Sequence, residues 1–332
     1  MSLIDDIRNR AIKADKKIVL PESDDPRTIE ALDYILDKKI AKIILVGKDD
    51  LRRAIKSKNL RGMLELIDPE KYKDIDEMAS VYYELRKAKG MTPEEAKETV
   101  RKDYLIFGGM LVRQGLADGF VAGANHTTPD VIRAALRCLP IDKNIGVVSG
   151  AFLMVVPDSP YGDKGAFIFA DCGVNPEPSA KQLAGIAVCS ADLFKKLTGG
   201  TPRVAFLSYS SKGSAGGPLV EKVKEAVAKA KESLPGLFVD GEFQVDSAIV
   251  PEVARRKCAE GEVAGKANVL IFPDLNSGNI SYKLTQRLAN ARAVGPHLMG
   301  FIKPASDVSR GCYAEDIVDA VAITAIRAFP RP

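Results

Sequence analysis

A short segment near the carboxyl end of the chain combines a hydroxyl, a cation and a carboxylate close to an expected helix N-terminus. Ser309 and Arg310 precede Gly311, and Asp316 lies in the first turn of a helix that we expect to begin near Tyr313. A carboxylate there favours the helix dipole, which is the ordinary structural explanation of Asp316. Arg310 lacks such an explanation, because a cation near a helix N-terminus opposes the dipole unless an anion joins them. The segment therefore predicts an anion-binding site.

A second candidate anion site is the loop of residues 208–217, which is rich in serine and glycine. It follows an expected strand at 204–207 and precedes a helix that begins near Pro218. Small residues let backbone N–H groups approach an anion, and the helix N-terminus favours negative charge. Lys212 adds a cation, and Ser214 adds a hydroxyl. An ordinary flexible connection between strand and helix is the structural alternative.

The same order of strand, small-residue turn and helix N-terminus recurs over residues 122–133. Thr127 or Thr128 would cap the helix, and Arg133 lies one turn in, where it could reach an anion bound at that end. A solvated or salt-bridged arginine is the structural alternative.

A polar loop is expected after a strand at 269–272 and before the next helix. Ligands of open α/β sheets bind at the carboxyl ends of strands, so this loop is a further candidate, although a well-capped turn would have the same composition. Its candidate ligands are Asn276, Ser277 and Asn279.

The elements that must position these residues alternate along the chain. Short β-branched runs, such as Lys17–Leu20 and Gly119–Ala122, are followed by longer amphipathic stretches, which is the pattern of βαβ units and a mainly parallel sheet. The runs at 152–156 and 166–170 are separated by a loop of hairpin length, so part of a sheet is expected to be antiparallel. Another strand is expected at 298–302.

The predicted fold class is α/β, with two three-layer α/β domains. Domain I comprises residues 1–144 plus 302–332, because the last strand and helix can return to the first domain, and domain II comprises residues 145–301.

Composition excludes several classes of protein. The 332 residues carry 48 basic and 44 acidic side chains, a net charge of +4 that is too even for the basic stripe of a nucleic-acid-binding protein. Two histidines, His126 and His297, cannot form a three-histidine metal site, and the five cysteines contain no C-x-x-C pair. No signal peptide, membrane span or dinucleotide-binding G-x-G-x-x-G is recognisable. We therefore expect a cytoplasmic protein that binds neither nucleic acid nor a membrane.

Four motifs follow one another along the chain: KGSA at 212–215, VDGEFQ at 239–244, FPDLNSGN at 272–279 and KPASDVSRG at 303–311. Together they resemble the phosphate acetyl/butyryltransferase family, and the resemblance covers essentially the whole chain. It implies a fold similar to that of isocitrate dehydrogenase, with a cleft between the domains, and a homodimer in which domain II makes the dimer contacts. It also implies the reaction acetyl-CoA + phosphate ⇌ CoA + acetyl phosphate, with coenzyme A as a substrate, no metal or other cofactor, and coupling to acetate kinase.

The resemblance assigns three catalytic roles. Asp316 is the base that takes the proton of the CoA thiol, Ser309 is the hydrogen-bond partner of the thiol or the acyl oxygen, and Arg310 holds the phosphoryl group. A carboxylate is a weak base for a thiol with a reference pKa of about 8.5, but a nearby cation stabilises the thiolate. Transfer is expected to be direct, in a ternary complex, without an acyl-enzyme.

The resemblance also implies residues that bind substrate. Arg133 would contact the phosphate of acetyl phosphate or of CoA, and Arg86 would bind a CoA phosphate, with Lys87 as a near alternative. We interpret Cys172 and Cys312 as packing residues, because nothing in the sequence activates either thiol. The remaining predicted binding residues are Thr128, Lys212, Ser214, Asn276, Ser277 and Asn279.

Two alternative functions stay open at this point. A phosphate butyryltransferase would have the same chemistry with a wider acyl pocket, although the motif details favour acetyl. A metal-dependent hydroxyacid dehydrogenase of the same fold would need an aspartate cluster for Mg²⁺ or Mn²⁺. Asp240, Glu242 and Asp246 are the one tight acidic group, and we interpret them as structural.

Overall fold

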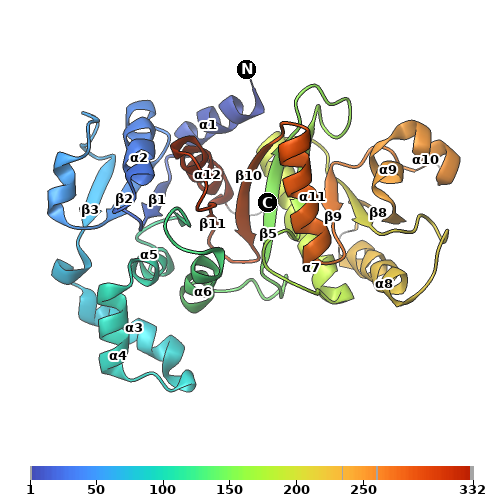
Figure 1. Ribbon diagram of the computed structural model, residues 1–332. Coiled ribbons are helices and arrows are strands. Elements are labelled where there is room, and N and C mark those ends of the chain that lie inside the picture. The colour runs from blue at the N-terminus through green and yellow to red at the C-terminus, as the bar shows by residue number, and fades with distance from the viewer. Residues whose placement is uncertain (1, 234, 259–260, 330–332) are drawn as a thin grey trace. The chain divides into compact units, whose positions relative to one another are not determined.

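The chain forms two compact units in the computed structural model, which describes residues 2–233, 235–258 and 261–329 (Figure 1). Unit 1 contains Met1–Pro140 and Phe301–Pro332, and unit 2 contains Ile141–Gly300. The domain boundaries expected from the sequence lie between residues 144 and 145 and between residues 301 and 302. Met1 and residues 330–332 of the expected domain I lie outside the described residues.

Unit 1 is built on a parallel sheet with the strand order β3–β2–β1–β4–β11. Its last two strands lie in register, with Asp307 opposite Ala122. The carboxyl ends of β1, β4 and β11 therefore lie at one edge of the sheet, followed by the loops that begin at residues 21, 123 and 308. The strands are β1 (Lys17–Leu20), β2 (Lys42–Val46), β3 (Leu64–Ile67), β4 (Gly119–Ala122) and β11 (Ala305–Asp307).

Helices cover both faces of this sheet, with α1, α2 and α12 on one face and α5 and α6 on the other (Figure 1). Helices α2 and α6 begin at side-chain caps: Asp25 caps α2 before Pro26, and Thr127, one of the two caps expected from the sequence, caps α6. The helices are α1 (Leu3–Ala14), α2 (Pro26–Lys38), α3 (Ile75–Arg86), α4 (Pro93–Lys102), α5 (Tyr104–Arg113), α6 (Thr128–Cys138) and α12 (Ala314–Arg327), with 3₁₀ turns at Asp49–Arg53, Pro69–Lys71 and Lys87–Lys89.

Unit 2 has a mixed sheet with the strand order β10–β5–β6–β9–β7–β8. The predicted hairpin is confirmed, because β5 and β6 are antiparallel, and β10 also pairs antiparallel with β5. The strands are β5 (Ser149–Val155), β6 (Ala166–Ala170), β7 (Arg203–Leu207), β8 (Phe238–Phe243), β9 (Val269–Ile271) and β10 (Arg292–Met299); the helices are α7 (Ala180–Thr198), α8 (Pro218–Ser233), α9 (Val245–Ile249), α10 (Pro251–Lys257) and α11 (Leu275–Leu288).

Two expectations about local structure are wrong. The strand expected at 298–302 ends at Met299 as part of β10, and the strand that returns to unit 1 is β11, three residues later than 302. The polar loop expected at 273–279 is short, because Asp274 already caps α11 by accepting from the Ser277 N–H at 2.9 Å. No helix of the described residues is long and apolar enough to cross a membrane.

Candidate functional site

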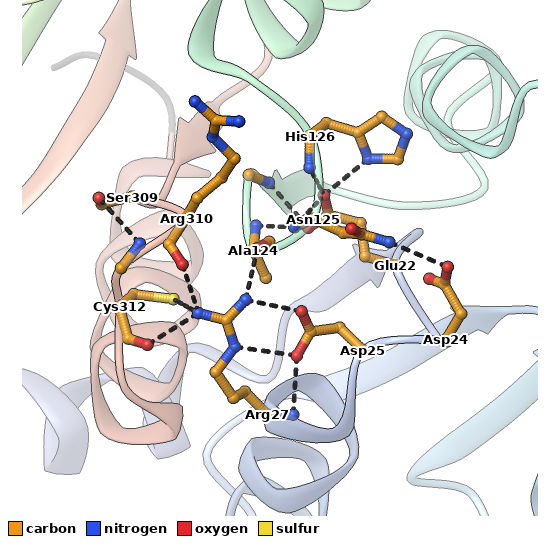
Figure 2. A network of polar contacts seen from close by, with 12 residues as sticks. Glu22, Asp24, Asp25, Arg27, Ala124, Asn125, His126, Ser309, Arg310 and Cys312 are labelled. Atoms are coloured by element: carbon orange, nitrogen blue, oxygen red, sulfur yellow. Dashed lines mark hydrogen bonds and ion pairs between the residues drawn. The ribbon is translucent and has the colours of Figure 1, made fainter.

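A buried carboxylate organises the loop after β4. Glu22, which follows β1 and is 3% exposed, accepts four backbone N–H groups. Its Oε2 accepts from Gly123 and Ala124 at 2.8 Å each, and its Oε1 accepts from Asn125 at 3.0 Å and His126 at 2.9 Å (Figure 2). The backbone cradle predicted for an external anion thus holds a carboxylate of the chain itself. Glu22 is not among the residues that the sequence predicts.

His126 shares this carboxylate. Its Nδ1 lies 2.8 Å from Glu22 Oε1, and its side chain is 40% exposed. Figure 2 shows the ring held at Nδ1, with the other ring nitrogen turned away from Glu22.

Arg27 ties together the loops that follow β1, β4 and β11. Its Nε and Nη2 bond Asp25 at 3.0 and 2.7 Å, and Nη2 also donates to Ala124 O at 2.5 Å (Figure 2). Its Nη1 donates to Arg310 O at 2.6 Å and Cys312 O at 3.0 Å. The hydrogen bonds from Arg27 lower the pKa of Asp25, so this pair is ionised. The one feature of the sequence that could have pointed to Arg27 is its position directly after Asp25 and Pro26, where a helix is expected to begin.

The Ser309–Arg310 pair lies on the exposed loop between β11 and α12. Ser309 Oγ accepts from the Gly311 N–H at 3.2 Å. The Arg310 guanidinium has no hydrogen bond or ion pair to any described residue, and it points away from the Arg27 network (Figure 2). The Arg310 side chain is therefore an unpaired cation near a helix N-terminus, an arrangement that is unfavourable unless an anion binds there.

Asp316 lies in the first turn of α12, as predicted. Its Oδ2 accepts from the Tyr313 N–H at 2.8 Å, which satisfies one free donor of the helix N-terminus. Its neighbours Glu315 and Asp319 instead pair with Arg8, at 2.9 and 2.6 Å. The structure thus places Ser309, Arg310 and Asp316 in unit 1, on one loop and the helix turn that follows it.

Thr128 does not cap α6, since Thr127 holds that position. The Thr128 hydroxyl donates to Asp307 Oδ2 at 2.5 Å, and the other carboxyl oxygen of Asp307 has no partner among the described residues. Burial raises the pKa of Asp307 to about 7, so the acid can stay protonated near neutrality. Gly123 packs against it, and a Cβ at Gly123 would collide with Asp307 Oδ1.

A groove of about 1310 Å³ opens on unit 1 beside these loops. Arg133 lines it, 54% exposed and paired with Asp130 at 2.7 Å. Arg86 does not line it. Its Nε is buried and has no hydrogen-bond partner in the described part of the chain, and Lys87 pairs with Glu84. The basic side chains of the groove are Lys48, Lys102, His126, Arg133 and Arg137.

The loop predicted as an anion site in unit 2 is also closed by its own chain. Glu242 Oε1 accepts from the Gly213 N–H at 2.7 Å and from the Ser210 hydroxyl at 2.9 Å. Lys212 Nζ pairs with Asp240 Oδ1 at 2.7 Å. Although burial opposes its ionisation, the bond from Lys212 holds the pKa of Asp240 below its ordinary value. Ser214 Oγ accepts from the Ser211 N–H at 2.9 Å.

The three polar residues after β9 lie in the first turns of α11. Asn276 is exposed there, while Asn279 Nδ2 donates to Cys172 O at 3.1 Å. Burial raises the pKa of Cys172 well above its ordinary value and that of Cys312 to about 11, so neither thiol is activated. Among the described residues, no three His, Cys, Asp or Glu side chains are grouped as metal ligands.

Comparison with known proteins adds to this geometry. The model of the phosphate acetyl/butaryl transferase family matches residues 2–325. The phosphate acetyltransferase of Thermoanaerobacterium thermosaccharolyticum is 49% identical over 99% of this chain and 100% of its own length, and that of Acetivibrio thermocellus is 50% identical over 99% and 98%. The crystal structure of a phosphotransacetylase from Streptococcus pyogenes is 40% identical and superposes with a TM-score of 0.91 over 99% of each chain.

Proposed function

Because the chain belongs to the phosphate acetyl/butyryltransferase family, we propose that it is a phosphate acetyltransferase, an acyltransferase that moves acetyl reversibly between coenzyme A and inorganic phosphate. The observation that carries the proposal is the free guanidinium of Arg310, which lies beside Ser309 on the loop that leads to Asp316 in the first turn of α12. A cation in that position suits a phosphoryl group. Full-length relatives named phosphate acetyltransferase favour acetyl over butyryl and over a metal-dependent dehydrogenase.

The chemistry follows from these groups in the direction that consumes acetyl phosphate. The Tyr313 N–H binds Asp316 Oδ2, so the other carboxylate oxygen, Oδ1, takes the proton of the CoA thiol. The thiolate sulfur attacks the acetyl carbonyl carbon, the new C–S bond forms, and the C–O bond breaks so that its electron pair leaves with phosphate. Ser309 hydrogen-bonds the thiol or the acyl oxygen. Arg310 holds the phosphoryl group and stabilises the charge that develops on it.

Binding of the substrate phosphates is proposed for the basic side chains of unit 1. Arg133 lines the groove, and a phosphate would compete with Asp130 for its guanidinium. Arg86 would have to turn from its partly buried position to bind a CoA phosphate. Thr128 would act through its bond to Asp307. From unit 2 we propose supporting contacts to substrate by Lys212, Ser214, Asn276, Ser277 and Asn279.

The same proposal includes the setting of the enzyme. It works without a metal or a bound cofactor, since coenzyme A is a substrate, and its acetyl phosphate is exchanged with an acetate kinase in the cytoplasm. Direct transfer in a ternary complex is supported by Cys172 and Cys312, whose raised pKa makes these two thiols poor nucleophiles.

A homodimer through unit 2 is also proposed. Ile280, Leu284 and Leu288 form an apolar stripe at spacings of four residues on α11 and are 56%, 53% and 81% exposed. Such a stripe on a helix is typical of a protein–protein contact. Light scattering should give twice the mass of the chain for the wild type and the mass of one chain for Leu288→Glu. A monomeric wild type would contradict the proposal.

The proposed function is tested by following release of the CoA thiol from acetyl-CoA and from butyryl-CoA. Each is measured with and without phosphate and with EDTA present. We expect phosphate-dependent release from acetyl-CoA that EDTA leaves unchanged. A preference for butyryl-CoA would assign the butyryl branch of the family, and an absence of release from either would contradict the proposal.

A further inference from the structure

The groove of unit 1 contains a histidine that the mechanism above leaves unused. His126 lines the groove, and its Nδ1 lies 2.8 Å from Glu22 Oε1. Glu22 is buried, and four backbone N–H groups donate to its two oxygens, so it is held as a carboxylate that accepts the Nδ1 proton. The ring is thereby fixed in orientation with a proton on Nδ1, and Nε2 is the nitrogen left to exchange a proton with a ligand (Figure 2).

This histidine lies on the loop next to the one that carries Arg310. Strands β4 and β11 are paired neighbours, and both loops leave the same edge of the sheet. Arg27 connects the loops directly, since it donates to Ala124 O and to Arg310 O. A carboxylate that orients a histidine, placed beside a loop with a free cation, is an arrangement suited to acid–base chemistry on a bound anion.

The proposed reaction has a proton step that Asp316 does not cover. When the thiol proton passes to Asp316 and the C–O bond of acetyl phosphate breaks, phosphate leaves with an added electron pair. If it left as the trianion, it would be a poor leaving group, so it needs a proton on the departing oxygen. Histidine suits this transfer because its charge changes near neutral pH.

We propose that His126 is the proton donor to the departing phosphate, with Glu22 as the residue that positions its ring. The donor is the imidazolium form of the ring, in which Nδ1–H bonds Glu22 and Nε2 carries the second proton. The Nε2 proton moves to the phosphate oxygen as the C–O bond breaks, phosphate leaves as HPO₄²⁻, and neutral imidazole remains with its proton on Nδ1. Solvent carries the proton held by Asp316 back to His126, which balances the cycle. In the opposite direction, HPO₄²⁻ gives its proton to Nε2 as its oxygen attacks the thioester carbonyl. This inference rests on the proposed function.

The test compares variants of the full chain in the direction that consumes acetyl phosphate. We expect His126→Ala to lower kcat about 100-fold while KM for coenzyme A changes little, because general acid catalysis contributes factors of this size. His126→Gln places an amide donor near the position of Nε2 but cannot transfer a proton, so kcat should stay low. Imidazole added to His126→Ala should restore activity in proportion to its concentration. Asn125→Ala, which loses only the bond to Asp24 in the same loop, is the matched control and should stay within about threefold of wild type.

The outcomes separate this inference from the function on which it rests. An inactive wild type contradicts the proposed function itself. If the wild type is active and folded His126→Ala keeps its kcat, or if His126→Gln restores it, His126 transfers no proton and the inference is overturned while the function stands. A rise in KM at constant kcat, or a failure of imidazole to rescue the low kcat, overturns it as well. Thermal melting of each variant identifies any that fail to fold, and His126→Asn, which keeps a bond to Glu22, then replaces His126→Ala.

Discussion

Two loops with similar small-residue composition, 123–127 in unit 1 and 208–217 in unit 2, each lead from a strand to a helix, and each closes around a carboxylate of the chain. Glu22 takes four backbone N–H groups, whereas Glu242 takes one backbone N–H and one hydroxyl. The loops differ most in what they leave free. In unit 2, Lys212 is neutralised by Asp240, but in unit 1 the loop next to Glu22 presents Arg310 without a partner among the described residues.

Backbone N–H groups alone therefore do not identify an open anion site. A loop of small residues can be saturated by a buried carboxylate of the same chain, because a buried donor without a partner costs about 1–3 kcal/mol. The groups that can meet a substrate without first breaking an internal bond are those that remain after this pairing. In unit 1 they include Arg310 and the outer nitrogen of His126.

The largest effect is expected where the cation is free. Arg310→Ala should lower kcat/KM about 1000-fold, equivalent to about 4 kcal/mol, because it removes the charge that stabilises the phosphoryl group in the transition state. The melting temperature should be unchanged, since only the main-chain oxygen of Arg310 takes part in the Arg27 network. Steady-state kinetics with acetyl phosphate and coenzyme A measure the loss. Wild-type activity in the folded variant would mean that the unpaired Arg310 contributes no more to catalysis than the paired Lys212 of unit 2.

The two carboxylates should differ in their contribution to stability. Glu22→Ala leaves the N–H groups of Gly123 and Ala124 buried without a partner and should lower the free energy of unfolding by about 3–4 kcal/mol. Glu242→Ala should lower it by about 1–2 kcal/mol, since one backbone N–H and the Ser210 hydroxyl lose their acceptor. Urea denaturation of both variants measures the difference. Equal losses would mean that the number of N–H groups does not set the stability of these loops.

Unit 1 also contains a pH-dependent group beside its loop, and Asp307→Asn isolates it. Burial raises the pKa of Asp307 to about 7, whereas an unfolded aspartate has a pKa near 3.9. The folded state then binds the extra proton, so the contribution of Asp307 is complete below about pH 4 and is lost as the pH rises to about 7. Asn stays neutral and can still accept from Thr128. Relative to Asp307→Asn, the wild type should lose about 2–3 kcal/mol of stability between pH 5 and 8 in urea denaturation. If the difference in unfolding free energy between the two proteins does not change over this range, Asp307 titrates in its ordinary range.

The sequence predicts those parts of the site whose signals are local. Pro26 after Asp25 marks the start of α2, and the position of Asp316 early in α12 follows from the helix expected near Tyr313. Glu22 could not be found in this way, because its partners lie about 100 residues further along the chain. The mainly parallel fold follows from the alternation of strands and helices, since that pattern repeats along the whole chain.

Strand β11 was missed for a related reason. Its three residues, Ala305–Asp307, include two polar side chains, which contradicts the pattern of a buried strand. The polar groups are tolerated because Ser306 bonds Thr324 and Asp307 bonds Thr128, contacts that no local pattern contains. Residues that hold loops together across strands are therefore the least visible in a single sequence.

The smallest effect is expected for the paired cation of unit 2. Lys212 must give up Asp240 before it can bind a substrate anion, so most of what it gains from that anion replaces an existing ion pair. Lys212→Ala should therefore lower kcat/KM by no more than about tenfold, about 1.4 kcal/mol, and mainly through KM. Kinetics in parallel with Arg310→Ala test this, with Lys231→Ala, which removes the second lysine on Asp240, as the matched control. A loss as large as that of Arg310→Ala would mean that Asp240 releases Lys212 when substrate binds. The ion pair with Asp240 would then not exclude Lys212 from the site.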